Sequence, residues 1–178
     1  MVKQVIQKKR TKKDSTWILS YDRFRPAQEG LRETLCTIGN GYMASRGASC
    51  GATVSRIHYP ATYIAGVYNK VPTKIAGRTI WNEDLVNVPN GFFLAFKVDD
   101  GDWVTLEKNK ILSYYQELDM KKGLLTKKVK MRDKKGRETS VITERFVHMN
   151  DMHLSALRYQ IIPENYDGEI TIRSGING

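Results

Sequence analysis

The sequence alternates apolar and polar residues in short segments, and turn residues separate one segment from the next. Side chains of a strand point alternately to its two faces. One face of residues 91–98 would carry Phe92, Leu94, Phe96 and Val98. The next four residues, Asp99–Asp102, contain one glycine and three aspartates and are typical of a turn. The pattern predicts a β-hairpin in which residues 91–98 pair with Trp103–Leu106.

A second hairpin is predicted between residues 124–132 and 137–147, because Asp133–Gly136 between them is rich in turn residues. Leu125, Val129 and Met131 share one face of its first strand. Lys127 falls on this apolar face and interrupts the alternation.

A third strand pair is expected between residues 154–162 and 169–173, across Pro163–Gly168. No segment carries a sustained apolar stripe at helical spacing, so only Pro26–Leu35 is predicted to form a short helical turn. A sheet with one apolar face must cover that face with another layer. The sequence therefore predicts an all-β fold, a large antiparallel β-sandwich.

The formal net charge of +10 raises the question of nucleic-acid binding. Six basic and no acidic residues lie in Met1–Lys13, and Lys121–Arg137 holds nine basic residues against Asp133 alone. The rest of the chain is net negative, so the excess charge belongs to one tail and one hairpin. We expect residues 1–14 to be a disordered basic tail, residues 15–178 to form the sandwich, and no nucleic acid to be a partner.

Composition also bears on the location of the protein. No apolar run is long enough to cross a bilayer, and the basic N-terminus lacks the apolar stretch of a secretory signal. Cys36 and Cys50 are the only cysteines and form no CxxC pair. These features favour a cytoplasmic protein without a membrane partner.

Two glycine-rich motifs match the residue pattern of a known functional signature but lack the surrounding features that the signature requires. Gly39–Ala44 fits the dinucleotide pattern GxGxxG/A, but no acidic residue lies between Glu33 and Glu83 to hold a ribose. Gly47–Gly51 spells GxSxG, but neither a buried strand before it nor a helix after it is expected. A tight turn explains the first motif better than a nucleotide site does.

The histidines and the acidic pairs give no complete site either. His58, His148 and His153 show no metal-ligand spacing with the cysteines and are expected to be structural or surface residues. Neighbouring acids such as Glu83 and Asp84 point to opposite faces of a strand, which prevents them from acting as an acid–base pair. No catalytic residue, metal ligand or cofactor is predicted.

A series of longer motifs is more specific than any of these. In order, they are Trp17–Leu19, Glu33–Leu35, Ile38–Gly47, Tyr63–Asn69, Leu85–Asn90, Glu117–Gly123, Glu144–Val147 and Pro163–Gly168. In this order and spacing the chain resembles the N-terminal domain of glycoside hydrolase family 65, which includes the maltose, trehalose and kojibiose phosphorylases.

The resemblance implies a supersandwich-like β-sandwich that is followed by a helical (α/α)6 barrel and is incomplete at the C-terminus of this chain. It implies a parent enzyme in which inorganic phosphate attacks the anomeric carbon of an α-glucoside with inversion, while a glutamic acid protonates the leaving oxygen. Phosphate is then a substrate, and some members hydrolyse instead. Because the acid and the phosphate site lie in the barrel, this chain is expected to be non-catalytic.

The motif residues allow two interpretations. Asn40, Arg46, Asn69 and Asn87 are expected to be structural, since Asn fills tight turns and a partly buried Arg binds carbonyl oxygens. Alternatively, a set of residues faces the barrel and shapes the rim of its sugar pocket. This set consists of Arg46, Tyr63, Tyr68 and Asn69.

Expected partners are the disaccharide substrate through the parent enzyme, the catalytic barrel in cis, and a second copy of the chain in a homo-oligomer. Two other functions remain open: a free-standing carbohydrate-binding β-sandwich module, and a basic protein that binds polyanions.

Overall fold

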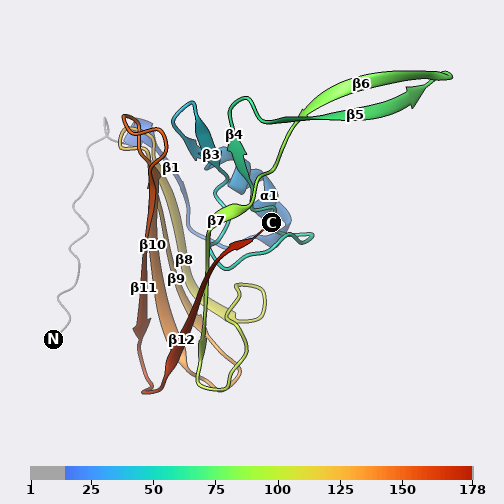
Figure 1. The fold of residues 1–178 in the computed structure, drawn as a ribbon. Helices are drawn as coiled ribbons and strands as arrows, with labels where there is room; N and C mark the ends of the chain where they lie inside the picture. The colour runs from blue at the N-terminus through green and yellow to red at the C-terminus, as the bar shows by residue number, and fades with distance from the viewer. Residues whose placement is uncertain (1–14, 178) are drawn as a thin grey trace.

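The computed structural model describes residues 15–177 and shows a β-rich fold with a single α-helix among these residues (Figure 1). The predicted tail, residues 1–14, lies outside the described residues. The elements are a 3-10 turn (Ser15–Trp17), β1 (Ile18–Tyr21), α1 (Pro26–Leu35), β2 (Ile38–Gly39), β3 (Met43–Ser45), β4 (Thr62–Ile64), β5 (Tyr68–Ile75), β6 (Arg78–Leu85), β7 (Asn90–Val98), β8 (Lys110–Asp119), β9 (Leu124–Arg132), β10 (Glu138–Val147), β11 (Ser155–Pro163) and β12 (Ile170–Asn177). The described part of the chain contains no helix long and apolar enough to cross a membrane.

A five-stranded antiparallel sheet in the order β1-β8-β9-β10-β11 forms one layer. It contains the predicted hairpin β9–β10, which is confirmed, with Val141 opposite Val129. The turn of this hairpin is fixed by Asp133, whose Oδ1 accepts the N–H groups of Lys135 and Arg137 at 2.8 and 2.9 Å. Gly136 supplies the positive φ of 83° that the turn requires.

A two-stranded sheet of β7 and β12 covers one end of the five-stranded sheet (Figure 1). Phe96 and Val98 of β7 pack against Tyr114, Val129, Met131 and Val141 of the larger sheet. These six buried side chains form the main core. Because two antiparallel sheets face each other across this core, the all-β sandwich prediction is confirmed.

The predicted partner of residues 91–98 is wrong. β7 pairs with β12, with Phe96 opposite Ile172, and Trp103–Leu106 is not a strand. Of that segment, Val104 donates its N–H to the carbonyl of Phe96 at 2.9 Å. After Val98 the chain turns, with the N–H of Gly101 donating to the carbonyl of Val98 at 3.0 Å, and continues as a loop.

The predicted pairing of residues 154–162 with 169–173 is also wrong, although both segments are strands. β11 pairs with β10, with Ile161 opposite Val141, whereas β12 pairs with β7 in the other sheet. The connection between β11 and β12 therefore passes from one layer to the other instead of closing a hairpin.

Helix α1 lies at the other end of the five-stranded sheet and fills the whole of Pro26–Leu35, the segment in which only a short helical turn is predicted. Cys36 and Ile38, which follow it directly, pack with Leu118, Leu125 and Val147 in a second core cluster. Beside α1 lies a small sheet in the order β2-β3-β4 (Figure 1). Its β2–β3 turn contains Gly41 at φ 87° and confirms a glycine-dependent turn at the GxGxxG/A motif.

Strands β5 and β6 pair only with each other and project from the rest of the molecule as an arm (Figure 1). Every residue of this arm except half-buried Thr73 is exposed.

Candidate functional site

The inward face of α1 is charged. Glu29, Arg32 and Glu33 of this helix are all buried. Arg32 donates from Nη1 to Glu29 Oε1 at 3.1 Å and to the carbonyl oxygen of Arg23 at 2.6 Å. Because a buried charge is costly unless it is paired and hydrogen-bonded, this face must meet complementary groups in the fold.

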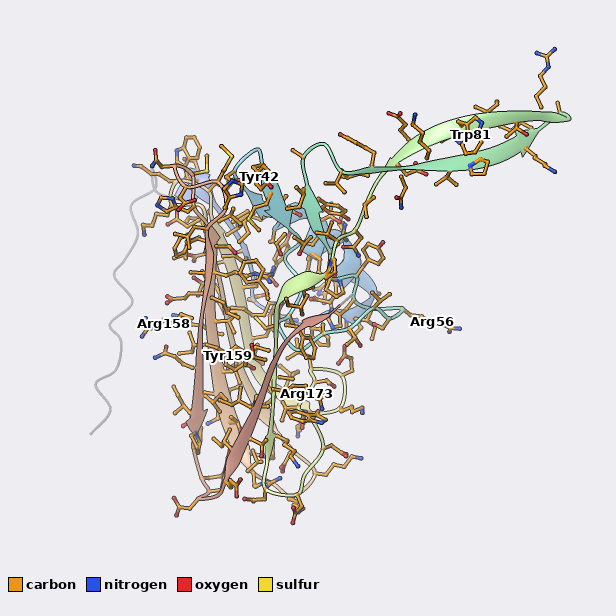
Figure 2. The ribbon with its side chains drawn as sticks, in the orientation of Figure 1. Tyr42, Arg56, Trp81, Arg158, Tyr159 and Arg173 are labelled. Atoms are coloured by element: carbon orange, nitrogen blue, oxygen red, sulfur yellow. The ribbon has the colours of Figure 1, made fainter. Side chains whose placement is uncertain are left out.

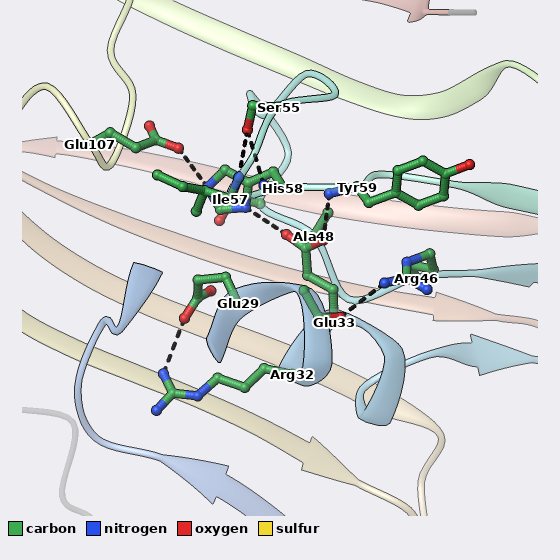
Figure 3. Close-up of polar contacts among 12 residues, drawn as sticks. Glu29, Arg32, Glu33, Arg46, Ala48, Ser55, Ile57, His58, Tyr59 and Glu107 are labelled. Atoms are coloured by element: carbon green, nitrogen blue, oxygen red, sulfur yellow. Dashed lines mark hydrogen bonds and ion pairs between the residues drawn. The ribbon is translucent and has the colours of Figure 1, made fainter. Parts of the chain in front are cut away.

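His58 provides one such group (Figure 3). Its ring is 2% exposed and lies between two carboxylates, with Nδ1 2.5 Å from Glu33 Oε1 and Nε2 2.6 Å from Glu107 Oε1. Ser55 Oγ accepts the N–H of His58 at 3.0 Å, and the N–H of Tyr59 donates to Glu33 Oε2 at 2.8 Å. The His58 cluster, defined as Glu33, His58 and Glu107, thus joins α1, the segment before β4 and the loop before β8.

The cluster changes the pKa values of His58 and Glu107. Burial alone would lower the pKa of His58, but its hydrogen bonds to Glu107 and Glu33, together with their negative charge, raise it to about 9. The hydrogen bond from His58 lowers the pKa of Glu107 to about 2. His58 is therefore a buried imidazolium at neutral pH, held between two carboxylates.

This pKa shift predicts how stability depends on pH. Below about pH 6.5 His58 is protonated in both the folded and the unfolded chain. Between about pH 6.5 and 9 the folded chain binds more protons, so the free energy of unfolding falls as pH rises, by roughly 3 kcal/mol in all. Urea unfolding at a series of pH values measures this. A His58→Gln variant should lose this slope, and equal slopes in both proteins would contradict the assignment.

A cavity of about 60 Å³ lies next to the cluster, between the two layers of the sandwich. Its lining includes Ser49, Cys50, His58, Glu107 and Lys127. Pockets that bind small organic ligands measure roughly 300–1,000 Å³. The cavity is therefore too small for a disaccharide.

Lys127, the residue that interrupts the alternation of its strand, is buried at this cavity. Its Nζ donates to Ser49 Oγ at 2.8 Å and lies 5.8 Å from the centre of the Tyr114 ring. Burial lowers the pKa of Lys127. Ser49 is the central residue of the GxSxG motif, which here lies in the connection between β3 and β4 and not on a strand–helix elbow.

The four candidate rim residues lie on three neighbouring parts of the chain. Arg46 follows β3; its Nη2 donates to the carbonyl of Gly30 at 2.9 Å, and its guanidinium lies 5.3 Å from the centre of the Tyr59 ring. Tyr63 is half-buried on β4, opposite Ala44 of β3. Tyr68 and Asn69 are exposed at the start of β5, where the arm begins.

Two of the asparagines expected to be structural are confirmed as such. Asn40 accepts the N–H groups of Tyr42 and Met43 through Oδ1, and its Nδ2 donates to the carbonyl of His148 at 2.7 Å. Asn87 accepts the N–H of Thr62 at 3.0 Å. Asn40 thus joins the β2–β3 turn to the β10–β11 turn.

The histidines agree with their prediction as structural or surface residues. His58 is buried, whereas His148 and His153 flank the β10–β11 turn, where His148 Nδ1 accepts the N–H of Asp151 at 2.8 Å. Among residues 15–177 no group of His, Cys, Asp and Glu side chains could hold a metal ion. The sequence alone did not predict the His58 cluster, because its three members are distant from one another along the chain.

Comparison with known proteins decides the family. The family model for the N-terminal domain of glycosyl hydrolase family 65 matches residues 19–178. The chain belongs to this family. An uncharacterized glycosyl hydrolase of Mycobacterium tuberculosis is 43% identical over 165 residues, which are 93% of this chain and 12% of the relative.

Other family 65 relatives carry names of phosphorylases. A kojibiose phosphorylase of Caldanaerobacter subterraneus is 34% identical, over 93% of this chain and 20% of the relative. A trehalose 6-phosphate phosphorylase of Lactococcus lactis is 35% identical, over 80% of this chain and 18% of the relative. The chain thus spans about a fifth or less of the length of these family 65 proteins.

A solved structure supports the fold of this family 65 domain. A putative kojibiose phosphorylase from the human microbiome superposes with a TM-score of 0.74, at 21% identity, over 89% of this chain and 21% of that one.

Proposed function

We propose that this chain is the non-catalytic sandwich domain of a cytoplasmic enzyme that cleaves an α-glucoside such as maltose, trehalose or kojibiose, by inverting phosphorolysis or by hydrolysis. The observation that carries the proposal is the match of residues 19–178 to an N-terminal domain whose named relatives are disaccharide phosphorylases. The reaction belongs to a helical barrel in cis, where phosphate attacks the anomeric carbon.

Two structural features favour a non-catalytic role for the domain. The carboxylates of Glu33 and Glu107 are both engaged by His58, and the cavity beside them is smaller than a sugar pocket. Leu31 and Leu35 on the outer side of α1 are 63% and 51% exposed. A helix that buries its charges and exposes its leucines provides an apolar surface for a further domain.

The test compares the 178-residue chain with the full-length protein that carries it. Each is incubated with phosphate and with maltose, trehalose or kojibiose, and glucose 1-phosphate and free glucose are measured. We expect turnover by the full-length protein alone. Consumption of a disaccharide by the isolated chain would overturn the proposal, and release of glucose without glucose 1-phosphate would identify a hydrolase.

The four rim residues give a second prediction for the full-length enzyme. If Tyr63 and Tyr68 border the sugar pocket, replacing either by Ala should weaken binding of the acceptor sugar by about 1 kcal/mol, or about fivefold in KM. Arg158→Ala is the control, because Arg158 is exposed on β11 and pairs only at the surface with Glu144. Unchanged KM in both tyrosine variants, with normal stability, would exclude the rim role.

The alternative function, a carbohydrate-binding module, is favoured by exposed aromatic side chains such as Trp81, which is 64% exposed. Calorimetric titration of the chain with maltose, trehalose and starch separates the two functions. A micromolar response would favour the module, and no heat of binding would favour the enzyme domain.

A further inference from the structure

A surface cleft of about 280 Å³ lies at the end of the sandwich away from α1 (Figure 1). One wall is the loop of residues 99–109 between β7 and β8, and the other wall is the β9–β10 turn, residues 133–137. Pockets that bind small organic ligands measure roughly 300–1,000 Å³. The cleft is close to the lower limit of this range, so it has room for one ring-sized ligand, unlike the cavity beside His58.

Ion pairs join the two walls of the cleft. Arg137 lies with Nη1 2.8 Å from Asp99 Oδ2 and with Nε 2.7 Å from Asp133 Oδ2. Within the loop after β7, Asn109 Nδ2 donates to the carbonyl of Thr105 at 2.7 Å. These contacts fix both walls in advance, which lowers the entropy that a ligand loses from the protein when it binds.

The half-buried side chain of Trp103 lines the cleft. The guanidinium of Arg173 on β12 (Figure 2) lies 3.9 Å from the centre of its ring, and Lys97 Nζ lies 6.0 Å from it. Both cations come from the same face of the β7–β12 sheet, because Arg173 is opposite Ala95, which shares a face with Lys97. These contacts hold the ring in place, and a fixed aromatic ring offers a flat apolar surface to the C–H groups of a sugar.

The remaining charges of the cleft are of both signs. Five charged residues of its lining form no ion pair within residues 15–177, and these are Asp100, Asp102, Lys108, Lys134 and Lys135. A carboxylate only accepts hydrogen bonds, whereas an ammonium group only donates them. The cleft therefore presents free acceptors and free donors side by side.

This mixture indicates the class of ligand. The two carboxylates oppose an anion such as phosphate, and the three ammonium groups oppose a cation. A neutral polyhydroxylated ligand uses both kinds of group, because each of its hydroxyls donates one hydrogen bond and accepts others. An aromatic ring beside such groups adds the apolar contact that a sugar ring requires.

We propose that this cleft binds the terminal ring of a neutral saccharide, which packs on Trp103 and forms hydrogen bonds with Asp100, Asp102 and the surrounding lysines. One ring in an open cleft buries little surface, so the expected Kd is about 1 mM. This affinity is weaker than the micromolar response that would favour a free-standing module. The inference does not rest on the proposed function, because the cleft and its lining alone carry it.

The experiment locates the bound sugar on the full-length protein that carries this chain. The probe is maltose with a diazirine group on its reducing-end glucose, used at about 1 mM, near the expected Kd. Irradiation releases N2 from the diazirine and leaves a carbene, which inserts into a nearby C–H, N–H or O–H bond. After proteolysis, mass spectrometry should find the probe on peptides that contain residues 99–109 or 133–137, and excess unlabelled maltose should remove it.

Two variants test the contacts. Trp103→Ala should lower the yield of this labelling about fivefold, because the apolar surface for the sugar ring is lost. Asp100→Asn/Asp102→Asn keeps the shape of the loop and should lower the yield about threefold, because hydrogen bonds to a charged acceptor are the stronger ones. Trp17→Ala is the matched control, because Trp17 is 53% exposed and does not line the cleft. Circular dichroism checks the fold, and the double Asp variant decides the test if Trp103→Ala fails to fold.

Each outcome decides the proposal. Labelling of the cleft that falls in the Trp103 or Asp variants but not in Trp17→Ala would support it. Absence of label from the cleft, label that unlabelled maltose does not displace, or equal yields in all variants would overturn it. Displacement of the probe by inorganic phosphate at the same excess would identify an anion site instead. None of these readouts depends on turnover, so they are independent of the test of the proposed function.

Discussion

The variant His58→Ala is expected to lower the free energy of unfolding by about 3–5 kcal/mol, because it leaves two carboxylates facing a site without a cation. Glu33 is 1% exposed and cannot turn to water, whereas the side chain of Glu107 is 30% exposed. Urea unfolding near pH 6.5, where the contribution of His58 is fully present, measures the loss.

A histidine at the surface provides the matched control. His153 is exposed, with its ring 4.6 Å from that of Tyr42, so His153→Ala should change stability by no more than about 0.5 kcal/mol. Adding Glu107→Gln to His58→Ala should recover part of the loss, since one of the unpaired charges is removed. Equal effects of the two histidine variants, or additive effects of His58→Ala and Glu107→Gln, would show that the cluster is not coupled.

The variant Phe96→Ala is expected to lower stability by a similar amount, about 3–5 kcal/mol, through a cavity in the main core. The Phe96 side chain is 1% exposed and lies between β7 and the five-stranded sheet, with its ring 6.4 Å from that of Tyr159. Because both layers contact it, the structure cannot close the space with a small movement of one side chain.

The neighbouring strand provides the control. Ile172 is the cross-strand partner of Phe96 but is 56% exposed, so Ile172→Ala should cost less than about 1 kcal/mol. A loss below 1 kcal/mol for Phe96→Ala, at an unchanged dependence on urea, would mean that β7 does not form the core layer described above.

Strands were easier to predict than their partners. The alternation of β9 and the turn Asp133–Gly136 predict their hairpin correctly, because a short turn leaves neighbouring strands little choice. β7 was predicted correctly as a strand, but its partner β12 lies far along the chain. Local sequence favours the nearest strand and contains no signal for this long-range pairing.

Helix α1 was predicted only as a short turn because its inward face is polar. Helical periodicity is recognised by an apolar stripe, but here Glu29, Arg32 and Glu33 are the buried residues. The buried face of α1 is therefore charged, whereas the sequence criterion looks for an apolar face. The reason for a buried Glu33 becomes visible only when the fold places His58 beside it, because the two residues are far apart along the chain.

Lys127 shows the opposite case. Its position on an apolar face was visible in the alternation of β9, and the structure confirms that it is buried. What the sequence did not predict is its partner Ser49, because Ser49 lies in a connection without periodicity. A charged residue on an apolar face is thus a useful sign of a buried polar contact, even when its partner is unknown.

The pairing of β7 with β12 has a consequence for the order of assembly during synthesis. β8, β9 and β10 are each followed along the chain by the strand they pair with, so the β8–β11 part of the sheet can form as it leaves the ribosome. β7 emerges before all of them, yet it must wait for Ile170–Asn177 to be translated. During this interval Phe96 and Val98 belong to a strand without its sheet partner, so their apolar side chains are transiently exposed.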